Sequence, residues 1–467
     1  MASAERVADI ASRRHVLPAV MLSREQISIW SILKHTIGKD LTRITMPIVF
    51  NEPLSFLQRL AEHMEYINLV KTAAQTDDPI RRIELVAAFS VAALAANRDR
   101  VAKPFNPMLG ETYELDRMHD LGFRYVSEQV CHHPPISAFH VDGDAFKFYG
   151  STCPRIRFFG QTVDCHMKGV STLELHKYNE TYTWGSPCCS VHNIVMGKMY
   201  IEYSGNINVY NHESGLSATI SLKPSTGWFQ STATPSLMQG HVFDRNKKRL
   251  RALYGDWREF VAACEPTAFE QNFASWSREH KLQREHNDRR PNQQHSRHSP
   301  PPNRRYSTTP DDVAAVGGEH TQHNRGRRLT VAKVTVPVVL PLLAGSDLLW
   351  RVNPRPELSE QFYHFTMFSL LLNELVDDCN YAPTDSRNRP DIRLMEQGKI
   401  DLASDEKHRL EEKQRGVAAD RKKSREQYKP LWFTCVEHPL VPGEELWRCN
   451  DAYWQRDWSK CEHIFGS

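Results

Sequence analysis

Apolar residues follow a helical spacing in the first quarter of the chain. Leu57, Leu60 and Met64 recur at that spacing, and Asp78-Pro79 opens a second run that extends to about Asn97. Within this run, residues 85–94 are apolar on every side, which predicts a helix that is buried all round. The alternative for the same segment is the lining of an apolar cavity.

From residue 111 onward the pattern changes to short strands separated by turns. Runs of strand-like composition lie at residues 146–149, 155–159, 171–175, 199–203 and 218–222. Turn-forming residues at 179–180, 204–206 and 213–215 predict hairpins. Many sequential strands at this spacing indicate an antiparallel meander, and its closure into a barrel would remove the exposed edges.

Residues 278–330 interrupt the folded pattern. They are rich in Arg, His, Pro, Asn and Gln, a composition typical of a disordered basic insertion. With a disordered leader at 1–16, the insertion divides the chain. Residues 17–277 are predicted to form a lid, N-terminal helices and the barrel, and 331–467 the remainder of the same domain, with a C-terminal helix and tail.

The segment after the leader predicts an amphipathic helix. Ser23-Arg24-Glu25-Gln26 has the pattern of a capping box, and Trp30, Leu33 and Ile37 fall on one stripe of the helix that follows. This stripe either packs permanently on the barrel or forms an interfacial lid that membrane contact opens. Both alternatives stay open at this point.

Composition and charge exclude several classes of protein. A net charge of +3 over 467 residues is too small for a general polyanion binder, and nucleic-acid binding is not expected. No run approaches the roughly 18 apolar residues that span a bilayer, and the N-terminus lacks the apolar segment of a secretory signal. The ten cysteines show no framework spacing. The sequence therefore predicts a cytoplasmic protein that meets membranes peripherally.

Metal and cofactor chemistry find little support. Cys435, His438, Cys449, Cys461 and His463 lack the paired spacing of zinc modules. The chain also lacks a G-x-S-x-G elbow, a P-loop and an H-E-x-x-H motif. We therefore expect no metal and no cofactor.

The most distinctive string is EQVCHHPPISAF, residues 128–139. Its prolines hold His132 and His133 in an extended segment, with ring N–H groups available to an anion. The string closely resembles the fingerprint of the oxysterol-binding protein family. Further segments that resemble this family are residues 103–112, 345–351, 363–366 and 407–415.

That resemblance implies a fold and a function. The family consists of lipid-binding and lipid-exchange proteins, not enzymes. The expected fold is β-dominated α+β, a large incomplete antiparallel β-barrel around a hydrophobic tunnel. One pocket would hold a sterol, or the acyl chains of phosphatidylinositol 4-phosphate, and many members carry phosphatidylserine instead. Carried over by motif, the headgroup residues are Lys103, Asn106, His132, His133, Lys407, Glu411 and Arg415.

Physical chemistry supports part of this set independently. Lys407, Glu411 and Arg415 stand four residues apart and therefore share one helix face. A phosphate group needs several charge-assisted donors, which Arg, Lys and imidazolium side chains supply. Glu411 would accept bonds from inositol hydroxyls or hold the Lys and Arg side chains in place. A solvated surface ladder is the alternative for this face.

The predicted function is the exchange of sterol, or another lipid, and phosphatidylinositol 4-phosphate between membranes. The main alternative is a lipid-responsive sensor or scaffold that binds these lipids without bulk transfer. A hydrolase with the histidines as general bases is a third hypothesis.

Overall fold

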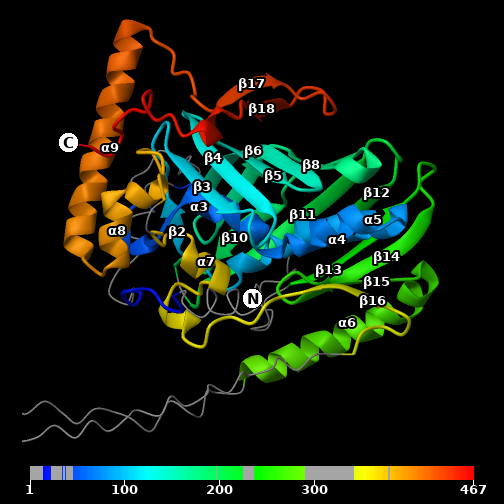
Figure 1. The fold of residues 1–467 in the computed structure, drawn as a ribbon. Helices are drawn as coiled ribbons and strands as arrows, with labels where there is room; N and C mark the ends of the chain where they lie inside the picture. The colour runs from blue at the N-terminus through cyan, green and yellow to red at the C-terminus, as the bar shows by residue number, and fades with distance from the viewer. Residues whose placement is uncertain are drawn as a thin grey trace, which may run out of the picture.

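A large curved sheet wraps around the N-terminal helices, and a long C-terminal helix stands at one side of it (Figure 1). The computed structural model describes residues 14–22, 34, 37, 46–195, 197–223, 236–289, 341–376 and 379–466, with only the backbone of residues 284–289. Among the described residues, each helix is too short or too polar to cross a bilayer.

The α-helices lie in an N-terminal group, a single helix between the last two strands of the large sheet, and a C-terminal group. Their bounds are α3 Phe56–Ala61, α4 Asn68–Gln75, α5 Pro79–Ala92, α6 Pro266–Arg289, α7 Met367–Leu371, α8 Pro390–Glu396 and α9 Ile400–Ser424. Helix α5 begins where the sequence predicts, because the Asp78 carboxylate accepts from the Ile80 backbone N–H and Pro79 occupies the first turn. Residues 85–92 are all buried, so the prediction of a helix surrounded by core is confirmed.

Fourteen described strands form one sheet. Their bounds are β3 Thr112–Arg117, β4 Phe123–His132, β5 Pro135–Gly143, β6 Phe146–Phe158, β7 Val163–Lys168, β8 Ser171–Leu175, β9 Glu180–Trp184, β10 Cys188–His192, β11 Tyr200–Asn211, β12 Ser217–Leu222, β13 Leu237–Phe243, β14 Arg249–Asp256, β15 Phe260–Cys264 and β16 Asp347–Arg351. Two small sheets accompany it: the parallel pair β1 Asn51–Ser55 and β2 Lys103–Phe105, and the antiparallel pair β17 Phe433–Glu437 and β18 Glu445–Cys449.

Two separate routes connect β6 to β11 within the large sheet. One passes through β7 and β10, and the other through β8 and β9, so the strands close into a ring there. The two ends of the strand order, β3 and β16, do not pair with each other within the described residues. The predicted incomplete antiparallel barrel is therefore confirmed.

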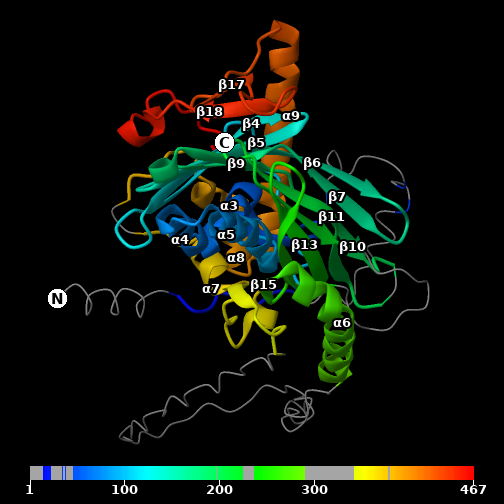
Figure 2. The same cartoon turned by 90° about the vertical axis from the view of Figure 1, so that its right-hand side faces the viewer.

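The N-terminal helices fill only part of this ring. The centroid of the Phe89 aromatic ring on α5 lies 5.5 Å from the Phe148 centroid on β6 and 6.3 Å from the Trp184 centroid on β9. Figure 2 shows α3, α4 and α5 within the curve of the sheet, on the side away from β7 and β10. The helices occupy the β8–β9 side, whereas the β7–β10 side encloses a cavity lined in part by Val163, Met167 and Val191.

One predicted turn is wrong. Residues 204–206 continue β11 rather than reversing the chain, because Ser204 pairs with Cys188 on β10 and Gly205 pairs with Leu222 on β12. Gly205 has φ of +100°, a conformation that glycine adopts without steric cost. The glycine allows a bend where the strand changes partners, and the hairpin turn comes at the other predicted position, 213–215.

The predicted segment boundaries are only partly covered by the described residues. Helix α6 continues to Arg289, beyond the predicted start of the insertion at 278, whereas residues 290–340 lie outside the described ranges. Of the predicted lid stripe, Trp30 and Leu33 also lie outside them, and Ile37 is 51% exposed. The lid and the division into segments stay predictions.

Candidate functional site

Two adjoining cavities lie in the described structure and share part of their lining. The first, with a volume of about 440 Å³, is lined by charged side chains and is called here the cationic cavity. The second, of about 360 Å³, is lined mainly by apolar side chains and is called the apolar tunnel. Residues common to both linings are Met46, Lys103, Asn106, Pro107 and His132. An elongated molecule could therefore occupy both at once.

The cationic cavity collects residues from five separate segments of the chain. Its lining consists of Met46, Asn51, Lys103, Phe105, Asn106, Pro107, Met108, His132, His133, Arg389, Lys407, Leu410, Glu411, Gln414, Arg415 and Ala418. All seven residues carried over by motif are in this set. The structure thus brings the predicted residues together, whereas Asn51, Arg389 and Gln414 were not predicted.

The histidine pair sits at the tip of the β4–β5 hairpin. His132 pairs with Pro135 across the turn, and the two imidazole centroids are 4.7 Å apart. The His132 Nδ1 atom is buried and has no hydrogen-bond partner among the described residues. Burial, together with the neighbouring His133, lowers the pKa of His132 to about 4. At neutral pH this imidazole is uncharged and offers a single N–H donor.

Lys103 is held by the small parallel sheet. Its backbone pairs with that of Asn51, whose side-chain amide donates to the carbonyl oxygens of Lys103 and Pro104 at 3.1 and 3.3 Å. The Lys103 ammonium donates to the Asn106 amide oxygen at 2.6 Å. Burial, with the Lys407 charge nearby, lowers the pKa of Lys103 to about 8. An anion in the cavity would relieve this repulsion.

Helix α9 supplies the third side of the cavity. Lys407, Glu411 and Arg415 all line it, as their spacing predicts, and the Lys407 ammonium forms an ion pair with the Glu411 carboxylate at 2.6 Å. One turn on, Gln414 accepts a hydrogen bond from the Leu109 backbone N–H at 3.0 Å. This bond ties the helix to the segment that carries Asn106.

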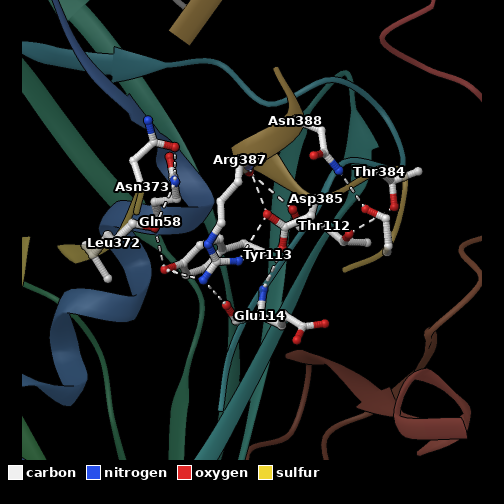
Figure 3. A network of polar contacts seen from close by, with 12 residues as sticks. Gln58, Thr112, Tyr113, Glu114, Leu372, Asn373, Thr384, Asp385, Arg387 and Asn388 are labelled. Carbon is white, nitrogen blue, oxygen red and sulfur yellow. Dashed lines mark hydrogen bonds and ion pairs between the residues drawn. The ribbon is translucent and has the colours of Figure 1, made fainter. Parts of the chain in front are cut away.

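A buried network next to the cavity fixes the segment before α8. In Figure 3 the Arg387 side chain points toward Asp385 and β3. Its guanidinium pairs with the Asp385 carboxylate at 3.0 Å and donates to the Glu114 carbonyl at 2.9 Å. The Glu114 backbone N–H donates to the same carboxylate at 3.2 Å. Residues 385–387 are therefore fastened to the barrel wall.

Arg389 connects this network to the cavity. Its guanidinium donates to the Asn106 carbonyl at 2.8 Å, and it pairs with the carboxylates of Glu111 at 2.9 Å and Asp391 at 2.7 Å. Arg389 thus joins the loop that bears Asn106 to the start of α8. We call Arg387, Arg389 and their carboxylate partners the arginine network.

The apolar tunnel runs along the inner face of the β7–β10 route. Its apolar lining includes Phe50, Phe56, Leu60, Leu94, Val101, Phe139, Ile156, Val163, Met167, Val191, Ile194, Met199 and Ile201. Leu94 thus lines the tunnel, whereas residues 85–92 do not. A polar group is also present in the wall, where the Asn97 amide donates to the Tyr203 hydroxyl at 2.8 Å.

Comparison with known proteins gives a consistent result across nearly the whole chain. Residues 28–458 match the family model described as oxysterol-binding protein. The chain is 42% identical over 460 residues to human oxysterol-binding protein-related protein 1, covering 98% of this chain and 44% of that protein. Its identity to mouse oxysterol-binding protein-related protein 2 is also 42%, over 98% of this chain and 88% of that protein. The chain thus spans less than half the length of the first relative.

Solved structures agree with the sequence matches. The Osh1 ORD domain in complex with cholesterol superposes with a TM-score of 0.72 at 30% identity, over 97% of this chain and 95% of that one. The Osh3 ORD of Saccharomyces cerevisiae in complex with PI(4)P superposes with a TM-score of 0.70 at 26% identity, over 97% of this chain and 99% of that one.

Proposed function

Because the chain belongs to the oxysterol-binding protein family, we propose that it binds and exchanges two lipids between membranes. One is a sterol, or another lipid that fits the apolar tunnel. The other is phosphatidylinositol 4-phosphate, with its acyl chains in the tunnel and its headgroup in the cationic cavity. The cholesterol and PI(4)P complexes of the Osh1 and Osh3 ORD domains support this pair of ligands.

The observation that carries the proposal is the shared lining of the two cavities. Lys103 and His132 line both, so a lipid whose headgroup lies among the cations has its chains directed into the tunnel. Burial of several hundred Å² of apolar surface is worth several kcal/mol at about 25 cal/mol per Å². A sterol in the tunnel would occupy the same space, and the two lipids therefore exclude each other.

Each headgroup residue has a proposed role. Lys103, Lys407 and Arg415 supply charged donors to the phosphate groups, and Asn106 orients Lys103. The imidazoles of His132 and His133 supply further donors. Glu411 holds Lys407 in place and accepts from inositol hydroxyls.

Mutual exclusion makes exchange possible without any bond-breaking step. The protein would release sterol at one membrane, take up phosphoinositide there and return with it, in peripheral contact with each surface. A phosphoinositide gradient would set the direction.

The test is lipid transfer between two populations of liposomes, followed separately for sterol and for phosphatidylinositol 4-phosphate. The His132→Ala/His133→Ala variant should lose phosphoinositide transfer yet retain sterol binding. The matched control is His119→Ala/His176→Ala, since both of these histidines are exposed and line neither cavity. Equal loss of both lipids by the folded cavity variant would refute the proposed roles. Binding of both lipids without transfer would favour the sensor alternative.

A further inference from the structure

Arg355 differs from the other arginines of the described residues. Every other arginine that is not exposed forms an ion pair with a carboxylate. The Arg355 guanidinium has five N–H donors, yet within the described part of the chain it makes one hydrogen bond, to the Ala95 carbonyl at 3.3 Å. It therefore keeps most of its capacity to bind an anion.

The backbone around Arg355 is rigid. Pro354 and Pro356 flank it, and each proline restricts its own φ and the residue before it. Burial, with the charge of Arg98 nearby, lowers the pKa of Arg355 to about 10. The guanidinium is thus held in place and partly removed from water, at a position where other cations repel it.

Further cations converge on the same place from separate segments. Although burial opposes ionisation of Asp99, the charges of Arg258, Arg98, Arg355 and His364 together lower the pKa of its carboxyl. Its ion pairs are long, 3.3 Å to Arg98 and 3.4 Å to Arg258. Burial, together with the charges of Arg355 and Lys198, lowers the pKa of His364. One carboxylate is therefore shared among several cations.

The charge balance of this cluster is positive. Arg98, Lys198 and Arg355 each contribute a positive charge. Three carboxyl groups oppose these charges. They are Asp99, Glu360, whose charge raises the pKa of His364, and Glu65, whose charge raises the pKa of Arg355. Burial and the nearby Glu62 raise the pKa of Glu65 to about 7, so it carries only a fraction of a negative charge. Within the described part of the chain, these positive charges exceed the negative ones.

We propose that Arg98, Lys198, Arg258, Arg355 and His364 form a second anion-binding site, which takes a phosphate group. Arginine forks and a lysine point charge are the donors that phosphate oxygens prefer. None of these five residues lines the cationic cavity or the apolar tunnel. Arg98 and Lys198 are, however, next in sequence to the tunnel residues Asn97 and Met199, so the site borders the tunnel wall.

The phosphate group could belong to a soluble ester or to a lipid headgroup at a membrane surface, and one pair of measurements distinguishes them. The first is calorimetric titration of inositol 1,4-bisphosphate into the His132→Ala/His133→Ala variant, which removes two donors of the cationic cavity. The variant should still bind the probe at one site, and addition of Arg355→Gln should weaken that binding at least tenfold.

The matched control is Arg351→Gln. Arg351 is an exposed arginine on β16, four residues before Arg355, and its replacement changes the net charge equally. Equal weakening by both substitutions would overturn the proposal, because it would show only an effect of net charge. Absence of binding in the histidine variant would also overturn it.

The second measurement is cosedimentation with phosphatidylcholine vesicles that contain or lack phosphatidylinositol 4-phosphate. Capture that depends on both the phosphoinositide and Arg355 identifies a lipid headgroup as the ligand. Binding of the soluble probe alone identifies a free phosphate ester. If Arg355→Gln does not fold, as judged by lost sterol binding, the exposed Lys198→Gln takes its place and should weaken binding about threefold.

Discussion

The cationic cavity and the arginine network lie side by side and share Arg389, yet they differ in how their cationic side chains are paired. In the network, each guanidinium is matched by buried carboxylates: Arg387 by Asp385, and Arg389 by Glu111 and Asp391. In the cavity, the Lys103 ammonium donates to a neutral amide, and the His132 Nδ1 atom has no partner among the described residues.

The pKa shifts of the cationic side chains Arg389 and Lys103 follow the same division. In the network, the charges of Asp391 and Glu111 outweigh burial and raise the pKa of Arg389. In the cavity, burial and the Lys407 charge lower the pKa of Lys103 to about 8. The network is thus complete without a ligand, whereas the cavity disfavours its own charges until an anion arrives. The degree of pairing separates charges that hold the fold from charges that bind a ligand.

The largest expected effect follows from breaking the network. Arg387→Met would leave the buried Asp385 carboxylate without its partner, and removal of one member of a buried pair costs about 3–5 kcal/mol. Denaturant unfolding measures this loss. The control, Arg415→Met, removes an exposed arginine of the cavity and should change the free energy of unfolding by less than about 0.5 kcal/mol. Similar losses in the two variants would contradict the division.

The converse experiment removes a charge from the cavity. Lys103→Ala should leave the fold intact and weaken binding of phosphatidylinositol 4-phosphate by about 10- to 100-fold, since a hydrogen bond to a charged group contributes about 1.5–3 kcal/mol. Equilibrium binding to the purified variant tests this, with the exposed Lys460→Ala as control. A large loss of stability in Lys103→Ala would place this residue with the structural charges instead.

How much of the cavity the sequence predicts depends on the kind of signal. Spacing alone places Lys407, Glu411 and Arg415 on one face, and the structure confirms it. Only the resemblance to a family joins that face to Lys103 and His132, because one sequence contains no information about contacts between distant segments.

The misses have physical causes of the same kind. Arg389 was not predicted because ion pairs with Glu111 and Asp391 hold it in place, and nothing in the local sequence identifies those partners. The stretches 146–149 and 155–159, predicted as two strands, belong, apart from residue 159, to the single strand β6, which changes partner from β8 to β7. There, as at Gly205, pairing across the sheet overrides the local preference for a turn.

The pH dependence of binding sharpens the comparison further. Below its pKa of about 8, Lys103 is already charged in the free protein, so its contribution to affinity is constant. Above pH 8 the free ammonium loses its proton, and a bound phosphate must restore it. Affinity should therefore fall as pH rises, by up to about tenfold per unit, until the raised pKa of the complex is reached. Lys103→Arg keeps its charge and should abolish the decline between pH 8 and 9. A decline unchanged in Lys103→Arg would assign it to another group.

The smallest expected effect concerns Glu411, the carboxylate within the cavity. Glu411→Gln releases Lys407 from its ion pair, and since partly exposed pairs are worth about 0.2–1 kcal/mol, affinity for inorganic phosphate should rise by up to about fivefold. Affinity for inositol 1,4-bisphosphate should instead fall, because the ligand's hydroxyls lose a charged acceptor. Calorimetric titration of both probes measures the contrast, and Glu412→Gln, an exposed neighbour outside the cavity lining, is the control. An equal rise for both probes would show that Glu411 only positions Lys407.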